Sequence, residues 1–177
     1  VVDLPGGATH HVTPTRRRWR RPSGVLQLTV IDAVSGAVLP ARASLRLGDG
    51  RHVAPDDAWM HGDEAFDRSQ RRFEFNYFHL DAPATITLPA GEATLEVMRG
   101  LEYAHVSRTL AVRAGETTTV RLPLSRIDHL AARGWYSGDL HVHMNYGGSY
   151  RNTPARLVRQ ARAEDVHVVE NLIVNKE

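Results

Sequence analysis

Hydrophobic and polar residues alternate along most of the chain between residues 24 and 124. Leu26, Leu28 and Val30 have polar residues between them, and the same period of two returns six more times. Because successive side chains of a strand point to opposite faces, each run predicts a strand that buries one face. The apolar positions of the later runs are Ala43, Leu45, Leu47; Phe73, Phe75, Tyr77; Ile86, Leu88; Leu95, Val97; Leu110, Val112; and Val120, Leu122, Leu124.

Turn-forming residues separate these runs at short intervals. They are Ser35-Gly36, Gly48-Asp49-Gly50, Pro89-Ala90-Gly91 and Ala114-Gly115, and they include residues that tolerate a positive φ. Seven short strands at this spacing predict an antiparallel β-sandwich of the immunoglobulin or transthyretin type over residues 23–127. Residues 1–22 contain proline and glycine without apolar periodicity, and they predict an irregular basic lead-in.

One acidic stretch, residues 53–70, has no strand period and predicts a long loop between two strands. The simplest interpretation is a solvated acidic loop. Two alternatives are a cation site and a loop that overhangs an active site. The polar residues concerned are Asp56, Asp57, His61, Asp63 and Glu64.

The pattern changes after residue 127. Residues 136–143 are strand-like, and Thr153-Pro154 is typical of a helix start with an N-cap followed by proline. Leu157, Val158 and Ala161 fit a helical stripe, and residues 166–174 are rich in β-formers. Strand, helix and strand form a βαβ unit, which builds a parallel sheet that is normally covered on both faces. Residues 128–177 therefore predict the start of an incomplete α/β domain.

Composition narrows the functional classes. The 177 residues contain no cysteine, which excludes a disulfide scaffold and a thiolate metal site. Five of the 22 basic residues lie in the run 16–21, and the remaining 17 are outnumbered by 20 acidic residues. A basic face for nucleic acid is therefore not expected, and the run is most simply a solvated tail, although it could contact phosphates or an acidic membrane. No apolar run approaches the length of a membrane span.

Metal-binding chemistry is indicated by two histidines in the first strand of the βαβ unit. His141 and His143 are two residues apart, so both imidazoles lie on one face of a strand. Neutral imidazole is a ligand for zinc, manganese or iron. Asp139 lies one step earlier on the same face and could bind the ion or orient an imidazole. Sites in open α/β sheets and barrels gather at the carboxyl ends of strands, where this pair lies.

The sequence around the pair resembles a known family. Residues 134–148, Gly-Trp-Tyr-Ser-Gly-Asp-Leu-His-Val-His-Met-Asn-Tyr-Gly-Gly, resemble the opening of the polymerase-and-histidinol-phosphatase (PHP) metallohydrolases, and more narrowly their carbaryl-hydrolase-like (CehA/McbA-type) branch. Asn152-Thr153-Pro154 and the ending at residues 171–177 are similar to that branch as well. Residues 24–124 resemble a carboxypeptidase regulatory-like (transthyretin-like) sandwich, through Val30-Ile31-Asp32, Ser35-Gly36, Pro40-Ala41, Ala43 and residues 88–92.

The resemblance implies a distorted (β/α)7 barrel that holds two or three divalent metal ions, of which this chain supplies the first two strands. His141 and His143 match the first metal-binding pair. Most relatives end the second strand in Thr-Asp-His, whereas this chain has Glu170-Asn171-Leu172. The carboxylates that remain as metal ligands are Glu170 and Glu177, although Glu170 could instead pair with an arginine. Asp139, Asn171 and Asn175 would support the ligands.

The predicted function is the N-terminal part of a metal-dependent hydrolase, in which a metal-activated water cleaves an ester, amide or carbamate. A PHP-type phosphoesterase and a non-catalytic β-sandwich binding module are the alternatives. The catalytic residues are not defined by the sequence, and no Gly-x-Ser-x-Gly elbow is present. The expected partners are the remainder of the same metallohydrolase, possibly as a separate chain, a small-molecule substrate and a second copy of the chain. The isolated chain is expected to be inactive, and the lead-in suggests a periplasmic or secreted location.

Overall fold

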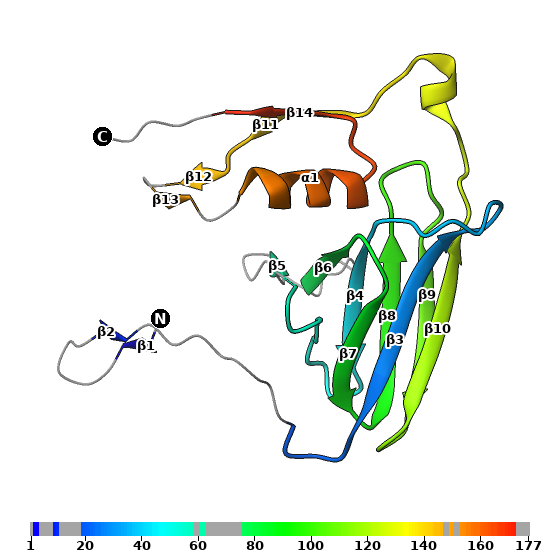
Figure 1. Cartoon of the computed structure of the whole chain (residues 1–177), viewed down its shortest axis with the longest axis vertical. Helices are drawn as coiled ribbons and strands as arrows, with labels where there is room; N and C mark the ends of the chain where they lie inside the picture. Colours follow the sequence, from blue (N-terminus) through cyan, green and yellow to red (C-terminus); the bar gives the residue numbers. More distant parts are fainter. Residues whose placement is uncertain are drawn as a thin grey trace.

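The computed structural model describes residues 2–3, 9–10, 19–58, 61–62, 76–146, 149–150 and 153–172. Two packed sheets form the larger part of the described chain, as the β-sandwich prediction required (Figure 1). The three-stranded sheet has the order β10-β3-β7 and contains β3 (Ser23–Asp32), β7 (Ala84–Pro89) and β10 (Thr117–Leu124). The five-stranded sheet has the order β5-β6-β4-β8-β9 and contains β4 (Ala41–Leu47), β5 (His61–Gly62), β6 (Asn76–Leu80), β8 (Gly91–Met98) and β9 (Val106–Val112).

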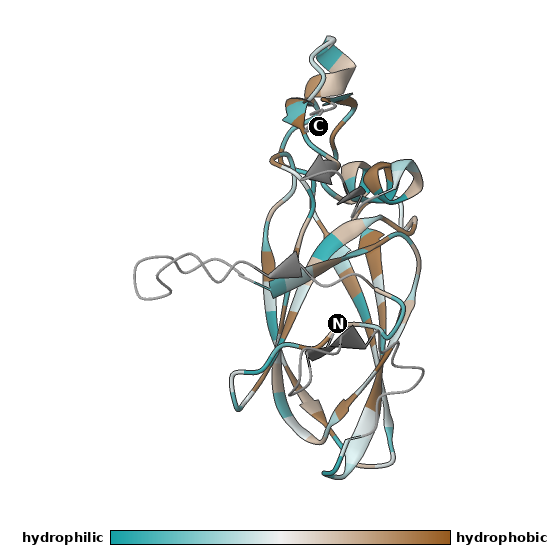
Figure 2. Cartoon of the chain, turned by 90° about the vertical axis from the view of Figure 1, so that its left-hand side faces the viewer, coloured by the Kyte–Doolittle hydropathy of each residue, from teal (hydrophilic) through white to brown (hydrophobic). Residues whose placement is uncertain are grey.

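The core lies between the two sheets and is built from the alternating apolar positions. Leu26 and Leu28 from β3 are fully buried, as are Leu45 from β4 and Leu95 from β8. Apolar segments along the sandwich strands are brown in Figure 2. Burial of such side chains is the main favourable term in folding, at roughly 1.5–3 kcal/mol for each. The period of two in the sequence therefore predicted the core of this unit.

Two details of the sandwich differ from the prediction. β10 runs parallel to β3, with Val120 beside Leu28, so the sandwich is not wholly antiparallel. β6 buries Phe78 and leaves its neighbour Tyr77 half-buried, so the inward positions are shifted by one residue from those expected. A long connection can bring any two strands side by side, and period alone specifies neither direction nor register.

The lead-in also contains short structure that was not expected. β1 (Val2–Asp3) and β2 (Thr9–His10) form an antiparallel two-stranded pair, with Val2 beside His10. Runs of two residues are too short for a periodic pattern, so the sequence carried no signal for them. Phe73 and Phe75, two of the expected core positions, lie outside the described residues.

A carboxylate organises the turn between β3 and β4. Asp32 accepts hydrogen bonds from the backbone N–H groups of Ser35, at 2.7 Å, and Val34, at 3.1 Å, and from the Ser35 hydroxyl at 2.8 Å. These bonds, first among them that from the Ser35 backbone, hold the pKa of Asp32 below its usual value. Gly36 follows with a φ of 72°, a left-handed conformation that favours glycine.

Replacing Asp32 with asparagine is expected to remove a pH-dependent part of the stability. A carboxylate whose pKa is lowered in the folded state stabilises above the unfolded pKa, near 4, and loses this effect as the pH falls through the folded value. The unfolding free energy of wild type should therefore exceed that of Asp32→Asn throughout pH 5–7, and the difference should shrink as the pH falls below about 4. Urea titrations at these pH values measure the difference, and a gap that is the same at all pH values would contradict the assignment.

The second unit follows β10 and contains the predicted strand, helix and strand. After a 3-10 helix, η1 (Leu130–Arg133), come β11 (Gly138–Val142), a hairpin of β12 (Asn145–Tyr146) and β13 (Ser149–Tyr150), α1 (Pro154–Ala163) and β14 (Val168–Asn171). β11 and β14 pair in parallel. The Thr153 hydroxyl accepts the N–H of Arg156 at 3.2 Å, which caps α1 as predicted. In the described part of the chain, no helix is long and apolar enough to cross a bilayer.

The parallel pair exposes large apolar side chains. Trp135 is 72% exposed and Leu140 66%, and Tyr136 and Val168 are exposed as well. Leu140 and Val168 belong to the parallel strands, whereas Trp135 and Tyr136 lie just before β11. A parallel sheet is normally covered on both faces, so exposed apolar side chains on its strands are typical of a sheet that packs against further structure.

Candidate metal centre

The two histidines converge at the carboxyl end of β11. His141 is the last residue but one of β11, and His143 directly follows the strand. Their Nε2 atoms lie 3.0 Å apart, and the ring centroids are 4.8 Å apart with the planes at 75°. Both side chains are exposed to solvent. The Nε2 atoms therefore point at the same place, and one ring must present a lone pair there because two N–H groups cannot face each other at this distance.

The geometry of the pair fits a divalent ion. Two nitrogens that bind one zinc ion at about 2.0 Å are about 3.3 Å apart in a tetrahedron and about 2.8 Å apart in an octahedron. The observed separation of 3.0 Å lies within that range. A cation beside both nitrogens would replace the proton that the two rings otherwise share. Among the described residues, no third His, Asp or Glu joins the pair to make a group of three ligands.

Asp139 supports the backbone of the pair. Its Oδ1 atom accepts the backbone N–H of His141 at 3.1 Å, which fixes the strand end from which His141 projects. Opposite, Asn171 is beside Val142 in the parallel ladder, and Leu172 donates its N–H to the Val142 carbonyl at 2.8 Å. The end of β14 is therefore adjacent to the segment between the two histidines.

The other candidate ligands are less well placed or undescribed. Glu170 is exposed on β14, does not join the histidines in a group of three, and forms no ion pair with an arginine in the part of the chain that the structure describes. Glu177 and Asn175 lie outside the described residues. A carboxylate ligand from this chain has therefore not been located.

The acidic stretch 53–70 begins inside the core. Val53 and Ala54 are buried, so the stretch is not a solvated loop from its start. Asp57 and its neighbours line a cavity of about 300 Å³ beside Asp81 and Arg159. Asp63 and Glu64 lie outside the described residues, as does the His61 side chain.

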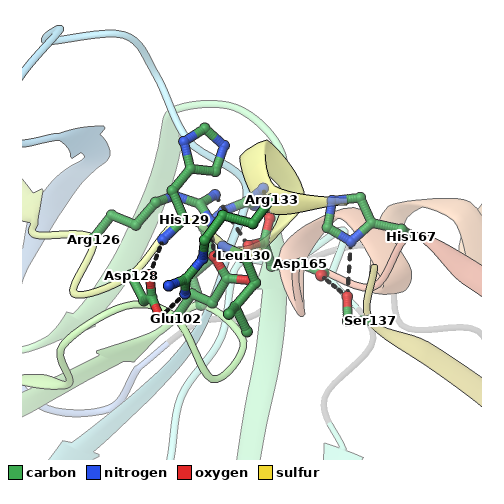
Figure 3. Close-up of polar contacts among 10 residues, drawn as sticks. Glu102, Arg126, Asp128, His129, Leu130, Arg133, Ser137, Asp165 and His167 are labelled. Carbon is green, nitrogen blue, oxygen red and sulfur yellow. Dashed lines mark hydrogen bonds and ion pairs between the residues drawn. The ribbon is translucent and has the colours of Figure 1, made fainter. Parts of the chain in front are cut away.

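Four basic side chains of the sandwich hold the loop between α1 and β14. The Asp165 carboxylate accepts hydrogen bonds from Arg99 at 2.6 Å and from Arg126 at 3.1 Å, and its side chain is 9% exposed. Figure 3 shows Arg126 beside Asp165. The carboxylate of the preceding residue, Glu164, contacts His79 Nε2 at 2.9 Å and Arg42 Nη1 at 3.3 Å. We call these six residues the junction cluster: Arg42, His79, Arg99, Arg126, Glu164 and Asp165.

Backbone contacts tighten the junction cluster. Arg99 also donates to the carbonyl oxygens of Pro40, at 2.6 Å, and Arg162. Arg126 binds Glu102 at 2.6 Å, and Glu102 accepts the backbone N–H of Leu130 at 3.1 Å. Buried charges are stable only when they are paired and hydrogen-bonded, so this network fixes the position of the α1–β14 loop on the sandwich.

Ser137 and His167 form a second polar contact beside the cluster. The Ser137 hydroxyl donates to the Asp165 carbonyl and lies 2.8 Å from His167 Nδ1 (Figure 3). The contact closes the βαβ unit at the amino ends of its strands.

The junction cluster and the histidine pair lie at opposite ends of the parallel strands. Asp165 precedes β14 and marks the amino ends, whereas His141 and His143 are at the carboxyl end of β11. The cluster was not predicted from the sequence, because Arg99 and Asp165 are 66 positions apart. The sequence carried no local signal for it; in the structure, Asp165 follows the C-cap residue Glu164 of α1 and has a φ of 54°.

Comparisons with known proteins leave the family open. No family model matches the chain, and no curated protein matches it. Solved structures that resemble the chain include the Bacillus anthracis TIE protein, which is 17% identical with a TM-score of 0.41 over 59% of this chain and 17% of that chain. The minor pilin GBS52 of Streptococcus agalactiae is 14% identical with a TM-score of 0.40 over 62% of this chain and 47% of that chain. The phospholipase PlaB of Legionella pneumophila is 15% identical with a TM-score of 0.36 over 67% of this chain and 28% of that chain. The chain spans less than half the length of each of these proteins. At these TM-scores the similarities carry no functional argument.

Proposed function

We propose that residues 128–177 begin a metal-dependent hydrolase domain of the PHP type, with the β-sandwich as its accessory domain. The observation that carries the proposal is the convergence of His141 and His143, whose Nε2 atoms are 3.0 Å apart at the carboxyl end of β11. The position agrees with the usual location of sites in α/β sheets and barrels. The resemblance of residues 134–148 supports the same family.

The chain's own residues would hold and orient the ion. His141 and His143 would bind a zinc, manganese or iron ion through Nε2, and Asp139 would fix the backbone that carries His141. A divalent ion in such a site lowers the pKa of a bound water to about 7 and polarises the bond under attack. This chemistry suits a small ester, amide or carbamate, and a phosphate ester is the alternative substrate for the same centre.

The remaining ligands would come from the rest of the domain. Two imidazoles leave at least two positions of a tetrahedral ion open. The exposed Leu140 on β11 and Val168 on β14 support a sheet that is covered by further strands and helices, in this polypeptide or in another chain. Residues 1–177 are therefore expected to bind the ion without hydrolysing substrate.

Metal titration of residues 1–177 tests the proposal. We expect zinc or manganese to bind at one ion per chain in equilibrium dialysis, and binding to fall at least about tenfold in His141→Ala and in His143→Ala, since each removes one ligand. His129→Ala, which removes an exposed histidine outside the pair, is the matched control and should bind as wild type does.

Equal metal binding by all four proteins would contradict the proposal. In that case the pair is an ordinary hydrogen-bonded surface contact, and the chain is better described as a β-sandwich binding module. The variants should keep the wild-type unfolding midpoint, because both imidazoles are exposed and carry little of the core.

A further inference from the structure

The sandwich carries a second group of convergent polar side chains, at the end away from the α/β unit. The chain enters β3 at that end, whereas α1 and β14 lie at the other end (Figure 1). The group contains Trp19, Arg20 and Arg21 from the basic run, and Asp49 and Arg51 from the turn after β4. It shares no residue with the histidine pair or with the junction cluster.

Trp19 attaches the end of the basic run to the sandwich. Its indole Nε1–H donates to the Thr87 carbonyl of β7 at 2.8 Å, and its ring is half-buried against the core. The Pro22 carbonyl then accepts the N–H of Ala90 at 2.9 Å. Residues 19–22 are therefore attached to the sandwich and do not form a free tail, although Arg20 and Arg21 are exposed to solvent as the sequence predicted; residues 16–18 lie outside the described residues.

A carboxylate orients two of the arginines. Asp49 accepts Arg51 through Nη2 at 2.8 Å and Nε at 3.1 Å, and it also accepts Arg21 Nη1 at 3.3 Å. The Arg51 guanidinium lies 5.5 Å from the centre of the Trp19 ring, in the range of a cation–π contact. The hydrogen bond from Arg51 lowers the pKa of Asp49, so this carboxylate stays ionised at neutral pH.

The space between these side chains has the size of a small-molecule site. Its volume is about 540 Å³, and its walls are Trp19, Arg20, Arg21, Asp49, Arg51 and Pro89. Ligand pockets commonly measure about 300–1,000 Å³. Three arginines and one aspartate line the pocket, and Arg20 has no ion-pair partner among the described residues, so these side chains carry an excess of two positive charges.

We propose that this pocket binds the phosphate groups of a small phosphorylated ligand, with Arg20, Arg21 and Arg51 as the donors. A phosphate carries a charge of about −1.5 to −2 at pH 7, which matches the excess in the pocket better than a carboxylate does. The planar guanidinium presents paired N–H groups at the spacing of phosphate oxygens, so arginine recognises phosphate through two parallel hydrogen bonds. Asp49 keeps Arg51 in place while no ligand is bound, which reduces the cost of ordering it.

Calorimetric titration of residues 1–177 with inorganic pyrophosphate at low ionic strength tests the proposal. We expect saturable binding that weakens at least about tenfold in Arg51→Ala and in Arg20→Ala, since each removes a charged hydrogen-bond donor. Arg113→Ala is the matched control, because Arg113 is an exposed arginine at the same end of the sandwich but does not line the pocket. Arg20→Ala breaks no ion pair to a described residue, so its unfolding midpoint should stay at the wild-type value.

Two further measurements, with lipid vesicles and with single-stranded DNA, identify the source of the phosphate. Binding of pyrophosphate without co-sedimentation with phosphatidylglycerol vesicles supports a soluble ligand. Binding to vesicles or to single-stranded DNA without saturable pyrophosphate binding would overturn the proposal, as would pyrophosphate binding that is equal in wild type, Arg20→Ala and Arg51→Ala. The histidine variants should bind pyrophosphate normally, so this result is independent of the metal centre.

Discussion

Replacing Asp165 with alanine should destabilise the protein by about 3 kcal/mol, since it leaves the largely buried Arg99 without a carboxylate partner and removes one of the two carboxylates that bind Arg126. Asp165 is 9% exposed and contacts Arg99, which is 12% exposed, and Arg126. Without Asp165, the Arg99 guanidinium would keep only the carbonyl oxygens of Pro40 and Arg162 as acceptors. Urea unfolding followed by far-UV circular dichroism measures the loss.

Asp81→Ala is the matched control. Asp81 also joins the sandwich to α1, through Arg159 Nε at 2.8 Å, but both side chains are well exposed. Exposed ion pairs contribute about 0–1 kcal/mol, so the control should lose far less stability. Equal losses in the two variants would mean that the junction cluster is an ordinary surface contact and does not hold the α/β unit in place.

Replacing Gly100 with alanine should cost about 2–4 kcal/mol, from a left-handed backbone and an overpacked contact. Gly100 has a φ of 53°, and a Cβ atom there would lie 2.6 Å from the Glu164 carbonyl oxygen and 2.8 Å from Asp165 Cβ. The nearer of these atoms, the Glu164 carbonyl oxygen, belongs to the backbone, so the α1–β14 loop must move away from the sandwich to make room. Thermal unfolding should show a clearly lower midpoint.

Gly115→Ala separates strain from crowding. Gly115 has a φ of 73°, and a Cβ there would meet no atom within 4 Å. Only the strain remains, at about 1–2 kcal/mol. A Gly100→Ala variant no less stable than Gly115→Ala would contradict the close packing of the two units.

The sandwich could be predicted from the sequence because burial imposes a local period. Leu26 and Leu28 alternate with polar residues, and they are fully buried in β3. The same reasoning failed where neighbours decide the outcome. The side chains of Tyr77 and His79 do not enter the core; both line the cavity beneath α1, and His79 binds Glu164. Contacts of this kind depend on residues far away in the sequence, which no local pattern encodes.

In the candidate site, too, local spacing could be predicted and long-range contacts could not. The spacing of His141 and His143 predicted that both imidazoles share one face, and their Nε2 atoms do approach to 3.0 Å. Further ligands could not be deduced, because they would come from strands whose relative position is set by the whole sheet. The junction cluster could not be predicted from the sequence either. It places the sandwich at the amino ends of the parallel strands, away from the two histidines.

The zinc K-edge X-ray absorption spectrum of the metal-loaded chain tests the central claim most directly. We predict at least two imidazole nitrogens at about 2.0 Å from the ion, with the outer-shell scattering that imidazole rings produce. This signal should disappear in the His141→Ala, His143→Ala double variant. A spectrum of oxygen ligands alone, or one that is unchanged in the double variant, would show that the two histidines do not hold the ion.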